Sequence, residues 1–488
     1  MPAAAAFLAL VAGANRRSLR VEEQAEHDSE SRRLTKPLLV YRCAATGAFP
    51  LAPFAYSVSA GHVHRRAALS QGAASERDPP EARPSDAAPC GRLQPGERMA
   101  ILDVLRGFSL LGVLVANMAI GFTGLVLLPR AEVSAMASGI DGIALVVIEA
   151  LFRRKSLTLL SFLFGLGFAL QIERAEARGK PVVPTYLRRL GALFVIGAVH
   201  AVLLWWGDQL TIYAIAGVLL LLFRRASVRS LLIWAALLIL VPRLLAAVPA
   251  ISRLLDPFDP AKADAFTARV LAALRGHDPA DTFRMQALQT VHSQGSLAAW
   301  QYLYNVGRFL LGYAAGRSRL FHGGEERLPF FRRLLFWGIG ISAVCTPISV
   351  ASRVLLRRGV TIPLAVKLAL VVPEEVGIIA STAVYLAALV LLMQRPAWER
   401  RLMVLAPVGQ TALTCYLTQS LICAFLFYGW GLGLMDRVGL ALCLPFSAAV
   451  FAAQIIASRL WLTRFRFGPF EWVWRTLTYG RQPVLRRE

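Results

Sequence analysis

Long apolar runs, separated by short polar or basic loops, make up most of the chain after residue 98. Several runs contain about 17 to 25 residues, which is enough for a helix to cross the hydrocarbon core of a bilayer. The pattern predicts an all-α, polytopic transmembrane helix bundle of about ten spans within residues 98–460. The expected spans are 104–128, 156–172, 188–206, 209–223, 230–250, 300–317, 333–352, 366–393, 403–428 and 438–460.

Lysine and arginine residues are concentrated in the loops that follow the second, fourth and sixth expected spans. Because cytoplasmic loops are enriched in these residues, we place these loops and both termini in the cytoplasm. The turn at residues 206–208 has no basic residue and therefore belongs on the opposite side. One loop disagrees with this topology, since Arg353, Arg357 and Arg358 follow the seventh span and would lie outside.

The first 97 residues differ in composition from the rest of the chain. They are rich in alanine, serine, proline, arginine and glutamate, as in residues 75–84, and contain too little apolar sequence for a core. We expect this extension to be disordered, or to result from a start codon assigned upstream of a true start near Met99. A signal peptide at residues 3–14 is a third interpretation, but no basic residue precedes that apolar run.

The last segment, residues 461–488, combines aromatic and basic side chains and contains a helix-starting proline at Pro469. Tryptophan is enriched where protein meets the headgroups of a membrane. We expect this tail to lie in the cytoplasmic interface of the bilayer.

Composition excludes several other classes of protein. Hydrophobic residues make up 56% of the chain, which is far above the usual fraction for a soluble enzyme. The net charge of +23 comes from arginines near the ends of apolar runs rather than from a basic stripe with interleaved aromatic residues, so we expect no nucleic-acid partner. None of the six cysteines forms a C-x-x-C pair, and four lie in apolar segments, so we expect no metal site.

Small residues recur at helical spacing in two expected spans. Ser161 and Gly165 are four residues apart in the second span, and Gly312 and Gly316 are four apart in the sixth. This spacing lets two helix backbones approach closely, so it predicts close packing inside the bundle.

His200 is the most informative polar residue of the expected spans. It lies about seven residues before the turn at 206–208, and therefore roughly 10 Å inside the bilayer. Intramembrane ionisable groups usually face a bundle interior or a water-filled cavity. Asp208 could orient its imidazole and make it a general base, so we name both as candidate catalytic residues. Alternatively, His200 only ties the hairpin together, and Asp208 only caps the following helix.

Asp103 and Arg106 open the first span three residues apart, which is the spacing of an ion pair on one helix face. An arginine at the cytoplasmic rim could bind the phosphates of a coenzyme or lipid, although it could also be a snorkelling topology anchor. Asn117 lies on roughly the same face and could line the same cavity, or bond to a neighbouring helix.

Three further charges lie at or near membrane depth. Lys155 opens the second span, and Glu374 and Glu375 follow a helix-breaking proline in the eighth. The two carboxylates could bind a cation or relay protons in a transporter. We favour the other interpretation, in which they form a solvated helix end.

The segment from residue 407 to 420 carries more polar groups than a lipid-facing helix tolerates, so it should face the bundle interior. Thr414, Tyr416 and Gln419 are its candidates for ligand binding, together with Tyr213 near the start of the fourth span.

Six motifs in order resemble the YeiB-like bacterial inner-membrane proteins that carry domain of unknown function 418. The resemblance covers about residues 98–482 and departs from the family at Gln410, where a basic residue is usual, and at Cys415, where asparagine is usual. The motifs are LDVLRGF at 102–108, KSLTLLSFLFGLG at 155–167, GAVH at 197–200, GDQLTIY at 207–213, ALTCYLTQS at 412–420 and FGPFEWVWR at 467–475.

The resemblance implies a multi-pass protein of the bacterial inner membrane. The family is distantly similar to membrane acyltransferases that move an acyl group from acyl-CoA, as co-substrate, to a glycan or small hydroxyl acceptor. In that interpretation Arg106 holds the donor's phosphates, and His200 accepts the acceptor's proton. Transport of a small solute is the alternative, although no internal repeat supports it, and a non-catalytic scaffold is a third.

Overall fold

A computed structural model describes residues 95–488, except 137, 178, 180, 252–259, 296–297, 322–323, 358, 481–483 and 488. The expected disorder or wrong start concerns residues that lie almost entirely outside this described part. The described chain is helical, with no β-sheet in the order of its elements. The predicted fold class, an all-α bundle of apolar helices, is confirmed.

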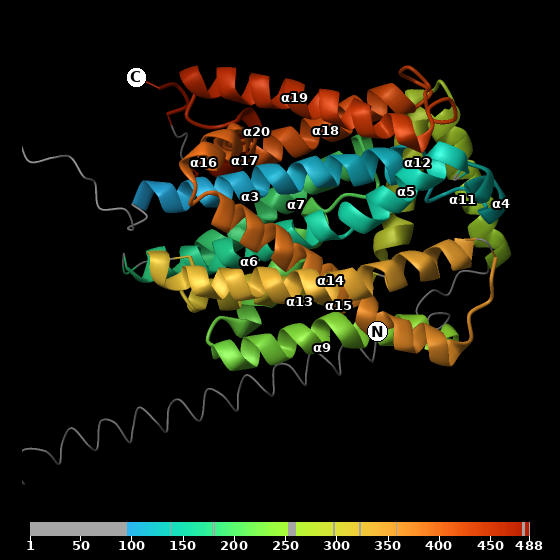
Figure 1. The fold of residues 1–488 in the computed structure, drawn as a ribbon. Coiled ribbons are helices and arrows are strands. Elements are labelled where there is room, and N and C mark those ends of the chain that lie inside the picture. The colour runs from blue at the N-terminus through green and yellow to red at the C-terminus, as the bar shows by residue number, and fades with distance from the viewer. Residues whose placement is uncertain are drawn as a thin grey trace, which may run out of the picture. The chain divides into compact units, whose positions relative to one another are not determined.

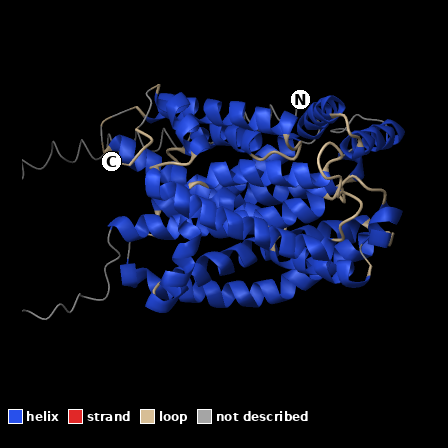
Figure 2. Cartoon of the chain, turned by 90° about the horizontal axis from the view of Figure 1, so that it is seen from above, coloured by secondary structure: helices blue, strands red, loops and turns tan. Residues whose placement is uncertain are grey.

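The long helices lie side by side, and the loops gather at the two ends of the bundle (Figures 1 and 2). The first half contains α3 (Pro95–Ala116), the π-helix η1 (Asn117–Phe122), α4 (Arg130–Met136), α5 (Gly139–Leu151), α6 (Lys155–Glu176), α7 (Val182–Leu203), α8 (Leu210–Leu220), η2 (Leu221–Phe223) and α9 (Val228–Ala247). The second half contains α11 (Pro260–Arg275), α12 (Pro279–Gly295), α13 (Ala298–Arg317), η3 (Gly324–Arg327), α14 (Leu328–Arg357), α15 (Leu364–Leu392), α16 (Pro396–Leu402), η4 (Met403–Leu405), α17 (Ala406–Gln410), α18 (Ala412–Phe427), α19 (Leu440–Arg464) and α20 (Pro469–Tyr479).

Seven helices of the described chain are long and apolar enough to cross a membrane, or eight if one bent pair forms a single span. The sequence predicted about ten. Two expected spans account for most of the difference, because the helix over Leu210–Phe223 is short, and α13 carries the polar residues Gln301, Asn305 and Arg308.

The expected span at 403–428 is broken. Its two parts, Pro396–Gln410 and Ala412–Phe427, meet at an angle of 79°. Helices were also missed in the stretches left unassigned at 129–155 and 251–299, where α4, α5, α11 and α12 lie. The apolar run of α5 contains only 13 residues, which is too short for a full span, and α11 and α12 are not predominantly apolar.

The two small-residue motifs pack against each other. A Cβ atom added at Gly165 of α6 would lie 1.8 Å from the carbonyl oxygen of Phe309 in α13, and one at Gly312 would lie 1.8 Å from that of Phe162. Backbone therefore touches backbone on both sides. The expected close packing is present, and the structure identifies the partner helix.

The bundle has two ends. The turn end contains residues 204–209, between α7 and α8, and the tail end contains the start of α3 and helix α20. Gly121, at the close of η1, lies against Trp205 of the turn end. Gly409 of α17 lies against the backbone of Asp103 near the start of α3.

Candidate functional site

His200 and Asp208 form a buried pair at the turn end. The His200 Nδ1 atom lies 2.8 Å from Oδ1 of Asp208, and the two side chains are 1% and 0% exposed. The helix α7 ends three residues after His200, so the chain returns through a tight turn and brings Asp208 back against the imidazole. This contact sets the orientation of the ring.

The second oxygen of Asp208 holds the start of α8. Oδ2 accepts hydrogen bonds from the backbone N–H and the hydroxyl of Thr211, both at 2.7 Å. A side-chain oxygen that accepts from a first-turn N–H is a helix cap. Both geometries expected from the sequence, the imidazole contact and the cap, are therefore present in one carboxylate.

The other imidazole nitrogen has no hydrogen-bond partner among the described residues. Nε2 of His200 is buried, and the ring centroid lies 5.1 Å from that of Tyr416 in α18. The Tyr416 hydroxyl in turn accepts a hydrogen bond of 3.3 Å from the backbone N–H of Gln209. Buried polar atoms without partners are rare and often have a functional role.

A cavity of about 420 Å³ lies beside this pair. Asp208 and Gln209 line it, as does Asn117 from η1, whereas His200 does not. The residues that line it come from η1, α3, the α5–α6 junction, the turn end, and the ends of α12 and α13. Its polar lining comprises Asn117, Arg153, Arg154, Asp208, Gln209, Ser293, Gln294, Gln301, Tyr304, Asn305 and Arg308.

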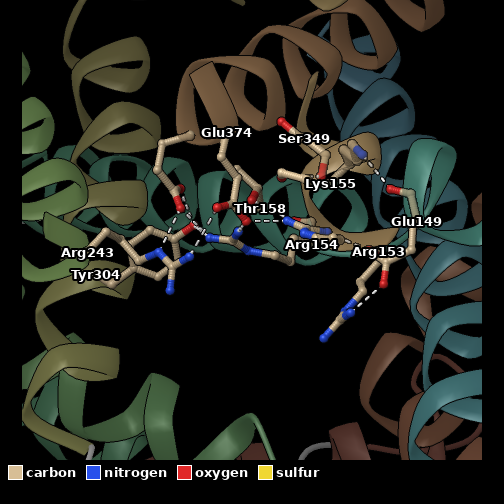
Figure 3. Close-up of polar contacts among 12 residues, drawn as sticks. Glu149, Arg153, Arg154, Lys155, Thr158, Arg243, Tyr304, Ser349 and Glu374 are labelled. Carbon is tan, nitrogen blue, oxygen red and sulfur yellow. Dashed lines mark hydrogen bonds and ion pairs between the residues drawn. The ribbon is translucent and has the colours of Figure 1, made fainter. Parts of the chain in front are cut away.

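The charged side chains that line a second cavity, of about 620 Å³, are Arg153, Arg154, Arg243, Arg353 and Glu374. We call these residues and the charged side chains that adjoin them the basic cluster, and Figure 3 labels several of its members. It contains six cations and three carboxylates, so it carries three more positive than negative formal charges. Its members are Arg153, Arg154, Lys155, Arg243, Arg308, Arg353, Glu149, Glu374 and Glu375.

Arg154 lies at the centre of the basic cluster. Its guanidinium donates to Glu374, Glu375 and the hydroxyl of Tyr304, the last at 2.6 Å. Its backbone has a φ of 64°, in the left-handed region, which is uncommon for a residue with a side chain. Arg154 stands where α5 ends and α6 begins, so this conformation and its three contacts hold the break between the two helices.

The carboxylates of the basic cluster are each shared between several arginines. Glu149 is bonded to Arg153 and Arg353, and Glu375 accepts from Nε of Arg243 at 3.0 Å. Lys155 donates to the backbone carbonyl of Glu149 at 2.6 Å. Ion pairs thus link α5, α9, α14, α15 and the α5–α6 junction.

Glu374 and Glu375 are not a solvated helix end, contrary to our expectation. The side chain of Glu375 is 1% exposed and that of Glu374 is 20% exposed, and both are ion-paired. The arginines that pair with them come from α9, α14 and the α5–α6 junction. Sequence adjacency could not show those partners.

The candidates at the tail end lie apart from the His200 pair. Asp103 and Arg106 form the expected ion pair, with 2.8 Å between Oδ1 and the guanidinium. Asn117, which lines the first cavity, lies eleven residues further along the same helix, or roughly 16 Å along its axis. Arg106 and Asn117 therefore do not share a cavity wall.

Thr414 lies at the tail end as well, where it contacts α20. Its hydroxyl donates to Oε2 of Glu471 at 2.6 Å, and its backbone N–H donates to Oε1 at 3.1 Å. Glu471 thereby caps α18, whose first turn follows the bend after α17. Trp474 adds a second contact, because its Nε1 donates to the carbonyl of Arg189 in α7 at 2.9 Å. The aromatic tail is docked on the bundle.

Burial raises the pKa of Glu471 above its ordinary value, despite the hydrogen bonds that favour its charged form. The carboxyl therefore contributes stability that is present at low pH and lost as the pH rises from about 4 through the folded-state pKa. We expect wild-type protein to lose thermal stability relative to Glu471→Gln over that range. Melting of both proteins in detergent at stepped pH measures this difference, and parallel curves would contradict it.

Two other candidates lie inside the bundle. The hydroxyl of Tyr213 is 2.7 Å from that of Ser161 and donates to a backbone carbonyl at 3.1 Å. Gln419 donates to Oε1 of Gln454 in α19 at 2.8 Å. Neither lines the cavities described above, so both contribute to helix packing in this structure.

Sequence reasoning missed most of the basic cluster. Arg154, Arg243 and Arg308 each interrupt or follow an apolar run, and Arg243 comes directly after Pro242 inside α9. A cation within an apolar segment costs free energy unless it is paired. The positions of these arginines therefore indicated that carboxylate partners lie inside the bundle. Among the described residues, no group of three His, Cys, Asp or Glu side chains is arranged to hold a metal ion.

The long apolar helices of the described chain define a multi-pass α-helical membrane protein. Residues 315–481 match the family described as "Protein of unknown function (DUF418)". The chain belongs to this YeiB-like family.

Three relatives support the assignment. "Uncharacterized protein YxaH" of Bacillus subtilis (strain 168) is 33% identical over 425 residues, covering 81% of this chain and 98% of the relative. "Uncharacterized protein YeiB" of Escherichia coli (strain K12) is 30% identical over 78% of this chain and 96% of its own length. "Uncharacterized 39.9 kDa protein in amylase 3'region" of Bacillus acidopullulyticus is 28% identical over 80% of this chain and 97% of its own length. No solved structure matches the chain.

Proposed function

We propose that this protein is an acyltransferase of the bacterial inner membrane that uses acyl-CoA as donor and a hydroxyl group of a glycan or small molecule as acceptor. The observation that carries the proposal is the His200 pair. Asp208 occupies Nδ1 of the imidazole, and Nε2 is left without a partner. A histidine oriented by a carboxylate through one nitrogen can act as a general base through the other.

The reaction balances with His200 as the only proton carrier. The acceptor oxygen bonds to the acyl carbon of the thioester while its proton moves to Nε2, and the C–S bond then breaks. The proton returns from Nε2 to the departing thiolate. Asp208 stabilises the charged imidazolium between these two steps.

Access to Nε2 requires one local movement. His200 is 2% exposed, and the adjacent cavity is lined by Asp208 and Gln209 rather than by the imidazole. Tyr416 lies against the ring. In the proposed mechanism this side chain shifts when the acceptor binds, which uncovers Nε2 to the cavity.

The donor is placed by Arg106 at the tail end. Both termini and this end face the cytoplasm in the proposed orientation, so coenzyme A reaches Arg106 from the cytosol. The guanidinium is 31% exposed, although it is paired with Asp103, and its fork matches a phosphate.

Binding of acetyl-CoA to the detergent-purified protein, measured by calorimetry, tests the donor half of the proposal. We expect binding that is weakened at least tenfold in Arg106→Ala, because a charge-assisted contact to phosphate contributes about 1.5–3 kcal/mol. Arg188→Ala is the matched control, since Arg188 is an exposed arginine near the start of α7. Absence of binding by a folded wild-type sample would exclude the proposed donor.

Transport of a small solute is the second candidate function. One observation favours it, because one apolar segment of the described chain is broken, at the 79° bend between Pro396–Gln410 and Ala412–Phe427. Discontinuous helices line the substrate sites of many transporters. Vesicles containing the protein would then show solute flux that persists in the absence of acyl-CoA, which the acyltransferase does not produce.

A further inference from the structure

The second cavity has an unusual lining for a membrane protein. Four arginines and one glutamate face it, together with Trp300, Gln301 and Tyr304. Arginines inside an apolar bundle are normally neutralised by carboxylates, because an unpaired buried charge is costly. The lining thus has three more positive than negative formal charges, and two of its arginines, Arg154 and Arg353, are only 19% and 18% exposed.

The full basic cluster has the same imbalance of charge. Its three carboxylates are already shared: Glu149 serves two arginines, Glu374 serves three, and Glu375 serves two. The described members of the cluster thus carry three more positive than negative formal charges. A bound anion would remove that surplus.

The donors around the cavity are held in place before any ligand arrives. Arg154 is fixed by three contacts in a left-handed backbone conformation, and such strained residues cluster at binding sites. Nε1 of Trp300 is a buried donor with no partner among the described residues. Preorganised donors reduce the entropy lost when a ligand binds.

The cavity lies near the ends of the helices that build it. Ala246 precedes the last residue of α9, Trp300 lies in the first turn of α13, and Leu356 precedes the last residue of α14. The lining also includes Glu374, which lies ten residues into α15, so the cavity extends from these helix ends into the bundle.

We propose that the basic cluster binds the phosphate group of a ligand in this cavity. Arginine forks match the oxygens of phosphate two at a time, and a phosphate dianion offsets more of the surplus than a single carboxylate does. The group can belong to a lipid headgroup or to a soluble phosphate ester, since both carry the same chemistry. This inference does not depend on acyl transfer by His200.

The position of the site also defines where the rest of the ligand lies. Arg153, Arg154, Gln301 and Tyr304 line both cavities, so they form the wall between them. A ligand anchored by its phosphate in the basic cluster lies against residues that also border the first cavity, which Asp208 lines. If acyl transfer is established, this ligand is the acceptor, and the phosphate is its anchor.

Calorimetry on the full-length protein in detergent tests the proposal with two probes, inorganic phosphate and a short-chain phosphatidic acid. We expect both to bind, and Arg243→Gln to weaken the binding of each about tenfold, which corresponds to 1.4 kcal/mol. Arg243→Lys keeps the charge but loses the planar fork. Its affinity for each probe should therefore lie between that of wild type and that of Arg243→Gln. Tighter binding of phosphatidic acid than of phosphate identifies the lipid source, and equal binding identifies a soluble ester.

Arg275→Gln is the matched control. Arg275 is also ion-paired, to Asp436 at 2.7 Å, and its side chain is 39% exposed, compared with 37% for Arg243. We expect this variant to bind both probes as wild type does. Glu374 and Glu375 keep their contacts to Arg154 in Arg243→Gln, so that protein should remain folded.

Two results would overturn the proposal. One is the absence of binding of either probe at millimolar concentration to a folded wild-type sample, and the other is unchanged binding in both Arg243 variants. Neither result bears on the binding of acetyl-CoA or on Arg106. Failure of this inference is therefore distinguishable from failure of the proposed acyltransferase.

Discussion

Gly165→Ala is expected to destabilise the protein by about 3 kcal/mol, although glycine-to-alanine changes in helices ordinarily stabilise by about 1 kcal/mol. The added methyl group would lie 1.8 Å from the carbonyl oxygen of Phe309 and 2.6 Å from its carbon. Backbone atoms cannot change rotamer to make room. Helices α6 and α13 must therefore separate, which loosens the packing along the length of their contact.

Gly167→Ala is the control on the same helix. Nothing lies within 4 Å of a Cβ atom built at Gly167, so this change should be neutral or stabilising. Thermal melting in detergent, together with the monodisperse fraction on gel filtration, compares the two variants. Equal stability of both would show that α6 and α13 do not pack at the distance seen here.

His200→Gln is expected to lower the rate of acyl transfer by about a thousandfold, within the range of 10²–10⁴ that general-base catalysis contributes. Glutamine can still donate to Asp208, so the turn between α7 and α8 should keep its structure. The variant lacks a group that can take up a proton. Release of coenzyme A thiol from acetyl-CoA, in vesicles supplied with an acceptor, measures the rate.

A purely structural histidine would give a different pattern. Loss of stability with an unchanged rate per folded molecule would show that His200 only ties the hairpin, and would remove it from the mechanism. His277→Gln is the control, because His277 lies outside both cavities and contacts only the carbonyl of Gly429 among the contacts resolved for its ring.

Local spacing predicted contacts between residues that are near in sequence. The Asp103–Arg106 pair and the His200–Asp208 contact across a tight turn are both present. A separation of three residues on a helix, or of eight residues across a tight turn, brings such side chains close together. The roles of these residues in binding or catalysis stay predictions.

Arg353 shows where local reasoning failed. Its position in the sequence contradicted the predicted topology, because a basic residue was counted as a cytoplasmic anchor. In the structure it pairs with Glu149 and Glu374, which lie 204 and 21 residues away in the chain. Arg353 is a member of the basic cluster, and its charge is paired inside the bundle. Its position in the sequence therefore does not indicate on which side of the membrane the following loop lies.

The sequence by itself determined the class of protein, because apolar runs of sufficient length must form helices when no water is present to satisfy their backbone. It also determined the small residues through which helices can approach and the turn that joins His200 to Asp208. Only the tertiary structure decided which helices meet. Arg154, Arg243, Arg353 and Glu375 come from four different parts of the chain, and their juxtaposition depends on helix packing that no local pattern encodes. The basic cluster and its cavity are products of that packing.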